Sequence, residues 1–319
     1  MPLVSIIIVN WNAKKYLKGC IESILSQTFT DYEIILVDNA SSDNSVNFVK
    51  DNFPKINIIT NNKNMGFAQG NNIGIENCTG KIVVLFNPDA IADKEWLSIL
   101  VNVIQSSEKI AAVTGKMYYL GDKYGKNAVF CTWSKIDPYS ASPYNFHDDE
   151  PFSKVDYLSG AAMVVKRDVL EKIGYMDSDY FLYFEETDLC ARMIRSGYDL
   201  MYVPSAHVWH AVSPLSNSSE KIYYMERSRI RFTLKNFDLL NVISFFFIFF
   251  GETLYVLFRD IKNRNLSRTK IRFKAIMWNL LNLKNTLYAR KKHLSILQKN
   301  GSFQSYNKNL PLRSIKTKN

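Results

Sequence analysis

Cysteine is scarce in this chain of 319 residues, and its spacing excludes several kinds of site. The four cysteines, Cys20, Cys78, Cys131 and Cys190, lie at least 53 residues apart, so there is no Cys-x-x-Cys pair and no zinc-knuckle spacing. Isolated thiols are typical of proteins from a reducing compartment. The first residues lack a basic leader and their apolar run is short, so we expect no secretory signal peptide.

Acidic residues are scarce in the last hundred positions. The whole chain carries 40 Lys+Arg and 30 Asp+Glu, a net charge of +10, and its 47% hydrophobic content excludes general disorder. Residues 1–219 hold 19 basic and 25 acidic residues, whereas residues 220–319 hold 21 basic and 5 acidic ones. We therefore predict a mildly acidic globular domain over 1–219 and a separate, strongly basic region over 220–319.

The hydrophobic pattern of the first part alternates between strand and helix. Short apolar runs predict strands, and stretches with helical spacing separate them. The expected strands are 3–9, 33–37, 56–60, 81–86 and 111–118, and the expected helices are 15–27, 42–49, 66–76 and 93–105. This order predicts an α/β fold with a doubly wound, parallel sheet.

The pattern is weaker from about residue 120 to 154, which we interpret as a long functional loop rich in Tyr, Ser, Pro, Asp and Lys. Ordered structure is expected again over 155–165, followed by helices at 168–173 and 186–196 and a strand at 200–203.

Polar residues follow three of the expected strands directly. Asn10 follows the first strand, Asp38 the second, and Asn87 and Asp89 the fourth. Ligands of doubly wound sheets bind at the carboxyl ends of the strands, where carboxylates can bind a ribose hydroxyl or hold a divalent cation against a diphosphate. The alternative is that these residues only open turns.

Three glycines, Gly66, Gly70 and Gly74, are spaced by four residues. This spacing differs from the dinucleotide-binding glycine motif and places the glycines on one face of a helix. It allows either close packing on the sheet or close approach of a ligand.

Acidic and aromatic residues are concentrated over 179–192. Glu185 and Asp188 are neighbours on one face of the expected helix, while Glu186 points elsewhere. Acids at a helix N-terminus are favoured by the helix dipole, which alone would explain one or two of them. The preceding aromatic run at 180–184 favours a second reading, in which burial raises the pKa of a carboxylate toward that of a general base.

Two of the four histidines, His207 and His210, lie three residues apart after the expected strand at 200–203. Either one could bind a metal, although a structural role is the more common one for an isolated histidine.

Taken in order, these segments resemble the inverting family 2 glycosyltransferases with the GT-A fold, and within them the rhamnosyltransferase-like branch. The resemblance covers about residues 3–237. It rests on SIIIVNWN at 5–12, VDNASSD at 37–43, NMGFAQGNNIG at 64–74, FNPDA at 86–90, LSGAAM at 158–163, GYMD at 174–177, FEETDLCAR at 184–192 and VPSAHVWH at 203–210.

The resemblance implies a role for each matching residue. Asn10 and Asp38 would contact the nucleoside of a nucleotide-diphosphate sugar, and Asn64, Gly66, Asn71 and Asn87 would line the same donor site. Asp89 and His210 would hold Mg2+ or Mn2+ near the diphosphate. Glu186 would act as the base that deprotonates an acceptor hydroxyl, with Glu185 and Asp188 as alternatives.

Two departures from the family pattern concern the metal and the base. Asn87-Pro-Asp89 stands where the family usually has two aspartates, so one carboxylate remains. Glu186 replaces the usual aspartate, which lengthens the expected base by one methylene group.

The basic region contains a stretch, 239–258, whose only charged residue is Glu252, and a second amphipathic helix is expected over 271–288. The stretch is long enough to cross a bilayer, but Glu252 and basic residues on both sides favour a helix or shallow hairpin lying on an anionic membrane surface. The alternative is a soluble helical subdomain or a homodimer interface.

We therefore expect an enzyme on the cytoplasmic face of a membrane that transfers a hexose such as rhamnose to a glycan acceptor, with a lipid-linked glycan as the favoured one. Two other hypotheses are a polyprenyl-phosphate sugar synthase and a non-catalytic membrane-bound scaffold of the same fold. The chain contains no recognised nucleic-acid-binding module, so we expect no nucleic-acid partner.

Overall fold

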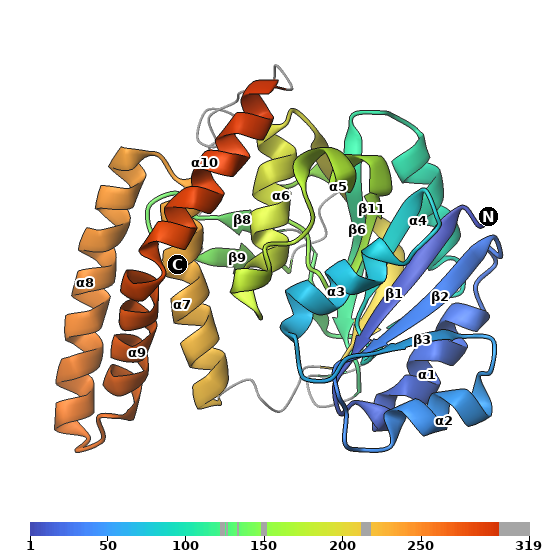
Figure 1. Cartoon of the computed structure of the whole chain (residues 1–319), viewed down its shortest axis with the longest axis horizontal. Coiled ribbons are helices and arrows are strands. Elements are labelled where there is room, and N and C mark those ends of the chain that lie inside the picture. The colour runs from blue at the N-terminus through green and yellow to red at the C-terminus, as the bar shows by residue number, and fades with distance from the viewer. Residues whose placement is uncertain (122–124, 126, 133, 148–151, 212–217, 300–319) are drawn as a thin grey trace.

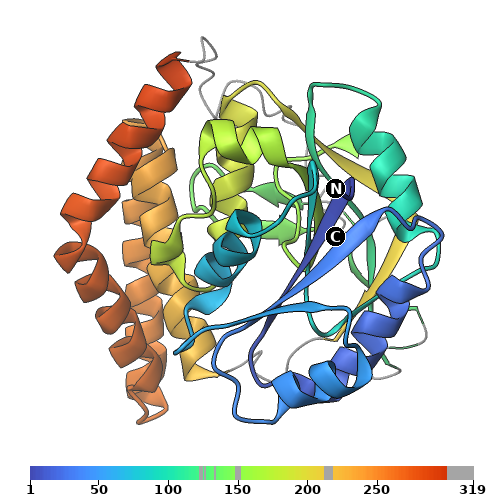
Figure 2. The same cartoon turned by 45° about the vertical axis from the view of Figure 1, so that its right-hand side comes forward.

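A twisted sheet with helices on both faces forms the first two thirds of the chain, and four helices lie beside it (Figures 1 and 2). The computed structural model describes residues 1–121, 125, 127–132, 134–147, 152–211 and 218–299. The expected α/β fold with a mostly parallel sheet and a helical C-terminal region is confirmed.

The expected strands and helices of the first 119 residues all form. The strands are β1 (Val4–Asn10), β2 (Tyr32–Asp38), β3 (Asn57–Thr60), β4 (Ile82–Phe86), β5 (Ala90–Ala92) and β6 (Ile110–Tyr119). The helices are α1 (Lys14–Leu25), α2 (Ser45–Asn52), α3 (Gly66–Glu76) and α4 (Trp96–Gln105). Only the short β5 was not expected, because three residues carry no periodic pattern.

The later elements are shorter and more varied. They are β7 (Val129–Cys131), β8 (Ser134–Ile136), β9 (Pro143–Asn145), β10 (Ser153–Lys154), β11 (Ala162–Lys166), α5 (Arg167–Ile173), the 3-10 turn η2 (Ser178–Tyr180), α6 (Glu185–Arg195) and β12 (Asp199–His210). The four C-terminal helices are α7 (Ser219–Asn236), α8 (Leu239–Lys262), α9 (Ser267–Leu281) and α10 (Leu283–Lys299).

The main sheet has the order β10-β12-β6-β11-β4-β1-β2-β3. Strands β3, β2, β1 and β4 are parallel to one another, whereas β11 runs antiparallel to both β4 and β6. Strand β1 is buried along its whole length, as expected for a central strand covered on both faces. Its carboxyl end, and those of β2 and β4, therefore meet at one edge of the sheet.

Two hydrophobic clusters fill the space on either side of the sheet. Ile7 and Val9 of β1 point into the cluster under α3, α5 and α6, and Ile6 and Ile8 point into the cluster under α1 and α4. The side chains of β1 alternate between these two cores because successive residues of a strand point to opposite faces.

The glycine spacing in α3 serves packing. A Cβ atom at Gly74 would overlap the side chain of Ile7, and one at Gly70 would come within 2.7 Å of Val9. Both glycines therefore let α3 lie close to β1, which favours packing over the ligand alternative for these two positions.

The prediction of one long loop over 120–154 was wrong for part of that segment. Strand β7 pairs with β6, β8 pairs with β9 as a separate hairpin, and β10 pairs with β12. These strands are only two or three residues long, so their local patterns are weak, and two of them pair with strands outside the segment. Residues 122–124, 126, 133 and 148–151 lie outside the described residues.

The strand expected at 200–203 was predicted too short, and the histidines do not follow it. Strand β12 continues to His210, so His207 and His210 lie within it. The pairing of β12 with β6 shifts in register between Val203 and His207, and Pro204 lies at this irregularity. A bulge of this kind accommodates a proline that a regular central strand would not.

The C-terminal region begins with α7, which packs against α6 and η2 on one side and against α9 on the other. The single helix expected over 271–288 is divided at Asn282 into α9 and α10, and this prediction was wrong in its bounds. Among the described residues, α8 is the one helix long and apolar enough to cross a membrane by length and composition. Figure 1 shows α8 at the outer edge of the molecule, beyond α9.

Candidate functional site

The ends of β1 and β2 bring Asn10 and Asp38 together. The two residues are paired in the parallel register, and the amide Nδ2 of Asn10 donates to Oδ1 of Asp38 at 2.7 Å. The backbone N–H of Ser41 donates to the other oxygen, Oδ2, at 2.9 Å. The Oδ1 of Asn10 is buried and has no hydrogen-bond partner among the described residues, so an acceptor remains available at this position.

The start of α3 lies beside this pair. The side chain of Asn39 donates to the carbonyl of Gly66 at 3.0 Å, and Oδ1 of Asn64 accepts from the N–H of Gly66 at 2.9 Å. Gly66 has a φ of +80° and a Cβ atom there would overlap the carbonyl of Phe181, so this turn requires glycine. Asn71 is buried and donates to the carbonyl of Phe67 in its own helix at 2.9 Å.

Asp89 and His210 come together because β5 and β12 pair. His210 lies opposite Ala90, and the N–H of Ala211 donates to the carbonyl of Asp89 at 3.0 Å. The Nε2 of His210 lies 3.1 Å from Oδ1 of Asp89 and 3.2 Å from Nδ2 of Asn87.

This corner has the donor atoms that a divalent cation requires, although few of them are charged. Oδ1 of Asn87 and Nδ1 of His210 are buried with no hydrogen-bond partner among the described residues. The described residues contain no cluster of three or more His, Cys, Asp or Glu side chains arranged around a metal. One carboxylate and few other protein ligands suit Mg2+ or a similar ion that also binds substrate phosphates, so the residues present fit such a metal.

The carboxylates of Glu185 and Glu186 open α6. Phe184, directly before them, has a left-handed backbone with a φ of +70°, and the helix begins at the next residue. Glu185 is buried and Glu186 is partly buried, and Oε2 of each has no hydrogen-bond partner among the described residues.

Burial raises the pKa of both carboxyl groups. The pKa of Glu186 rises to about 7, with the backbone N–H groups of Glu186 and Thr187 opposing the shift. Burial, together with the charge of Glu186, raises the pKa of Glu185 well above its usual range. A carboxyl group with a pKa near 7 is half ionised at neutral pH and can accept a proton there.

Residues Gly160 and Ala161 connect the acidic pair to the strand ends. A Cβ atom at Gly160 would lie 3.4 Å from Cβ of Glu186 and 3.3 Å from the ring of Phe67. The carbonyl of the next residue, Ala161, accepts from the N–H of Asn87 at 2.8 Å. Glu186, the start of α3 and the corner that holds Asp89 are therefore joined through one short segment.

Asp188 has a different environment from the two glutamates. It is fully buried and accepts from Lys235 at 2.9 Å, Arg192 at 2.9 Å, Asn236 at 2.9 Å and Tyr180 at 3.2 Å. Burial by itself would raise its pKa, but the charges of Lys235 and Arg192 hold the pKa of Asp188 far below its usual range. Such a carboxylate is a permanent anion that joins α6 to α7.

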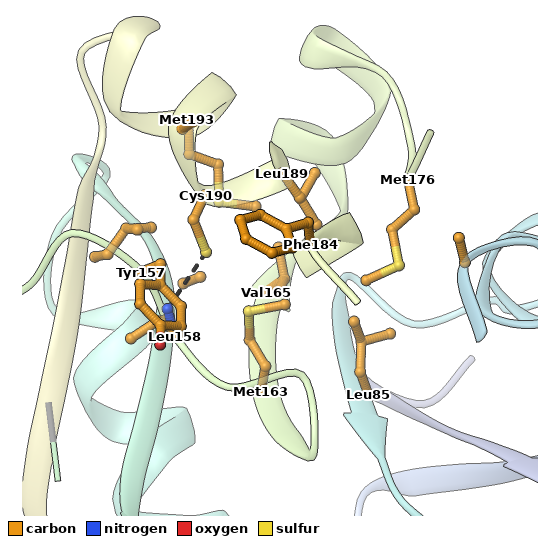
Figure 3. Packing of buried hydrophobic residues seen from close by; sticks show 14 of the residues in the cluster. Leu85, Tyr157, Leu158, Met163, Val165, Met176, Phe184, Leu189, Cys190 and Met193 are labelled. Carbon is orange, nitrogen blue, oxygen red and sulfur yellow. Dashed lines mark hydrogen bonds between the residues drawn. The ribbon is translucent and has the colours of Figure 1, made fainter. Parts of the chain in front are cut away.

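The helix that carries these acids rests on a well-packed core. Figure 3 shows Phe184, Leu189 and Met193 packed above Met163 and Val165 of β11 and Leu85 of β4. The N–H of Leu158 donates to Sγ of Cys190 at 3.5 Å, and burial raises the pKa of that thiol to about 12. The start of α6 is thus held on a rigid base.

Two features of this site were not predicted from the sequence. Phe181 and Tyr183, like Phe184, have positive φ angles, which few non-glycine residues adopt. Arg227 of α7 donates to the carbonyls of Asp179 and Tyr180 and so holds the start of this strained loop. No local signal marks an arginine as the partner of a loop 47 residues earlier.

The chain is similar to several known proteins and matches one family model. Residues 5–174 match the family model described as glycosyl transferase family 2. An uncharacterized glycosyltransferase of Haemophilus influenzae is 30% identical over 125 residues, and the match covers 38% of this chain and 39% of that protein. The chain thus spans well under half the length of that relative.

Two longer matches have lower identity. A low-salt glycan biosynthesis hexosyltransferase of Haloferax volcanii is 26% identical over 71% of this chain and 74% of its own length. An N-acetylglucosaminyl-diphospho-decaprenol L-rhamnosyltransferase of Mycobacterium tuberculosis is 23% identical over 65% of this chain and 76% of its own length.

Solved structures with the same fold include two glycosyltransferase complexes. GalNAc-T7 with UDP, GalNAc and Mn2+ has a TM-score of 0.62 at 15% identity, over 86% of this chain and 54% of its own. The mannosyltransferase of Pyrobaculum calidifontis in complex with GDP-Man and Mn2+ has a TM-score of 0.56 at 15% identity, over 94% and 87%. At these identities the likeness concerns the GT-A fold, while the family model covers more than half of the chain. The protein belongs to glycosyl transferase family 2.

Proposed function

We propose that this glycosyltransferase transfers a hexose, such as rhamnose, from a nucleotide-diphosphate donor to a hydroxyl group of a glycan, with inversion at the anomeric carbon. The observation that carries the mechanism is the carboxylate of Glu186. It is partly buried, its Oε2 has no hydrogen-bond partner among the described residues, and its pKa is about 7. A structural carboxylate would be paired, as Asp188 is.

The donor would bind across the ends of β1, β2 and β4. Asp38, oriented by Asn10 and Ser41, would accept hydrogen bonds from the nucleoside. Asp89, His210 and the unpaired oxygen of Asn87 would hold a divalent metal against the diphosphate; that oxygen has no partner among the described residues. When bound, such a metal stabilises the negative charge that develops on the leaving phosphate.

The chemical step would then depend on Glu186. Its carboxylate takes the proton of the acceptor hydroxyl, whose oxygen forms a bond to the anomeric carbon of the sugar. The bond from that carbon to the phosphate oxygen breaks on the opposite side, and the nucleoside diphosphate leaves with the electron pair. Of the three acids in the cluster, Asp188 is the least suited to this role, since two cations already neutralise it.

We further propose a lipid-linked glycan as acceptor and the cytoplasmic face of a membrane as the place of reaction. Two observations support this. The rhamnosyltransferase of Mycobacterium tuberculosis that this chain resembles is named for a diphospho-decaprenol acceptor. The described part of the C-terminal region also contains an apolar helix, α8, whose exposed residues are mostly hydrophobic.

Transfer assays with Glu186→Gln and Asp89→Ala test the mechanism. We expect Glu186→Gln to lower kcat by about 10²–10⁴-fold, the range typical of a lost general base, with little change in donor affinity. Asp89→Ala is expected to weaken metal-dependent donor binding. Full activity in both variants would contradict the mechanism, and transfer to a lipid phosphate that survives the loss of all three acids would favour a polyprenyl-phosphate sugar synthase.

A further inference from the structure

One face of α8 exposes a continuous hydrophobic stripe. Its members recur at intervals of three and four residues, which places them on a single side of the helix. Phe247 is 76% exposed and Phe258 is 69% exposed. The stripe consists of Ile243, Phe247, Phe250, Leu254, Phe258 and Ile261. Monomeric soluble proteins rarely expose so long an apolar surface without a partner.

The opposite face of α8 is held to the protein. Phe245 and Phe249 are buried, and their rings lie near the guanidinium group of Arg229 in α7. Glu252 accepts two hydrogen bonds from Arg229, at 3.0 Å each, and one from Arg272 of α9 at 2.7 Å. The only charge in the apolar stretch is therefore paired with α7 and α9, and the exposed stripe lies on the other side of the helix. Figure 1 shows α8 itself at the edge of the molecule.

The charges around the stripe are positive. From 239 to 299 the sequence has two carboxylates, Glu252 and Asp260, and both are bonded within the helical region. Exposed cations gather where α8 turns into α9, and more follow along α9 and α10. They are Lys262, Arg264, Arg268, Lys270, Lys274, Lys284, Lys291 and Lys292.

We infer that the stripe of α8 is a docking surface for a lipid bilayer that contains anionic lipid. The combination of aromatic and aliphatic side chains with flanking lysines and arginines matches an interface of acyl chains and negative headgroups. A second copy of the chain fits less well, because a symmetric contact would bring two equally basic regions together. This inference rests on the membrane location proposed above and deepens it, whereas the proposed sugar transfer can hold even if the docking surface is wrong.

The structure also indicates how α8 would lie. To cross the bilayer, the helix would have to leave α7 and α9 and carry Glu252 into hydrocarbon without its two arginine partners, which is costly. With those ion pairs kept, α8 lies in the plane of the membrane and only its stripe enters the boundary between headgroups and acyl chains. The rest of the protein remains in the water.

Sedimentation of the full chain with vesicles tests the surface. We expect binding to vesicles of phosphatidylglycerol and phosphatidylcholine, weaker binding to phosphatidylcholine alone, and release at high salt. Replacing two stripe aromatics, Phe247→Glu and Phe258→Glu together, is expected to weaken binding by about tenfold or more. The matched control replaces two exposed aromatics elsewhere, Tyr139→Glu and Phe152→Glu, and should bind as the unchanged protein does.

The charge contribution is tested separately with Lys262, Arg264, Arg268 and Lys270 all changed to Gln. We expect this variant to lose most of the preference for anionic vesicles. The control variant loses four exposed charges of the catalytic domain, with Lys50, Lys55, Lys94 and Lys109 changed to Gln. It should keep the preference for anionic vesicles. Donor hydrolysis in solution should be unchanged in the stripe variant and in both lysine and arginine variants, which separates this test from that of the proposed function.

Two results would overturn the inference. One is undiminished vesicle binding by the stripe variant. The other is a dimer that the same substitutions dissociate, with no vesicle binding by the unchanged protein, which would assign the stripe to a second copy.

Fluorescent labels at three introduced cysteines measure the orientation of α8. The four native cysteines are buried, so labelling should be confined to Leu240→Cys, Phe250→Cys and Phe258→Cys. The outer two sites are about 27 Å apart along a helix, close to the thickness of the hydrocarbon core. A helix in the plane gives all three labels the same shallow depth in quenching experiments, whereas a label at 250 much deeper than the other two would contradict this orientation.

Discussion

Glu186 and Asp188 lie two positions apart in one helix, yet their surroundings give them opposite ionisation behaviour. Burial raises the pKa of Glu186 to about 7, whereas Asp188 is buried among four donors, two of them cations, that hold its pKa far below the usual range. Pairs of acids whose environments separate their pKa values are a common basis for assigning a proton acceptor. The contrast supports Glu186 as the base and Asp188 as a link between helices.

The pH dependence of both activity and stability follows from the raised pKa of Glu186. The proposed mechanism requires the ionised form, so kcat/KM should rise with pH through about 7. Because the native state holds this proton more tightly than the unfolded state, Glu186 favours folding below the ordinary glutamate pKa and loses that contribution as pH rises through about 7. Glu186→Gln should thus be nearly inactive and, at a pH of about 8, more stable by roughly 1–3 kcal/mol in urea unfolding. The exposed control Glu76→Gln should change neither quantity, and a stability loss in Glu186→Gln would contradict the argument.

Asp188→Asn should mainly affect stability. Removal of this charge leaves Arg192 buried without a carboxylate and Lys235 with Asp177 alone, and we expect the free energy of unfolding to fall by about 3–5 kcal/mol at neutral pH. The pKa of Asp188 is depressed in the native state. The difference in stability between the two proteins should therefore be complete at any pH above the ordinary aspartate pKa, and it should shrink as pH falls through the native pKa of Asp188. Asp168→Asn, which removes an exposed pair with Lys172, should cost less than about 1 kcal/mol. Equal losses in both variants would show that Asp188 is not a structural anion.

At the scale of single elements, α3 and α8 use glycine differently. Gly74 lets α3 approach Ile7 of β1 so closely that a Cβ atom would overlap that side chain. Gly251 lies in an exposed part of α8, and a Cβ atom there would meet open space. Packing therefore requires glycine at Gly74 and does not require it at Gly251.

Alanine at these two glycines should have opposite effects. Gly74→Ala is expected to destabilise the protein by about 1–3 kcal/mol, because a methyl group would overlap a packed strand. Gly251→Ala should stabilise it by about 0.5–1 kcal/mol through the higher helix propensity of alanine. Thermal unfolding measures both, and a neutral Gly74→Ala would show that α3 can move away from the sheet.

The strand ends, the start of α3 and the start of α6 form the candidate donor and base sites only when they are brought together in the whole molecule. Asp89 and His210 are 121 positions apart and meet because β5 pairs with β12. A ligand that binds across these elements should stabilise the whole native state in proportion to its concentration over its dissociation constant.

A panel of nucleotides and nucleotide sugars, measured by thermal shift with and without Mn2+, tests that proposal. A matching donor at about 100 times its dissociation constant should add about 2.7 kcal/mol of stability. Asp89→Ala should remove the metal-dependent part of the thermal shift. Asp38→Ala should reduce the thermal shift caused by the nucleotide itself. The surface control Asp168→Ala should change neither quantity. A shift that is insensitive to both Asp89→Ala and chelation of the metal would contradict the assigned metal ligands.

The sequence by itself determined the features that depend on near neighbours. Strand and helix order over the first 119 residues follows from hydrophobic period, and the family follows from short motifs in a fixed order. The division of charge between the two parts of the chain is a property of composition alone.

Only the tertiary structure decided the features that depend on distant partners. The sequence favours Glu186 as the base but leaves Asp188 as an alternative. The two differ in the structure because Lys235 and Asn236, 47 and 48 positions after Asp188, bind Asp188 and not Glu186. In the sequence, the charge of Glu252 counts only against a simple membrane span. In the structure, Arg229 and Arg272 form ion pairs with it. Burial and ion pairing set the energy of a charge, and both are created by folding rather than by local sequence.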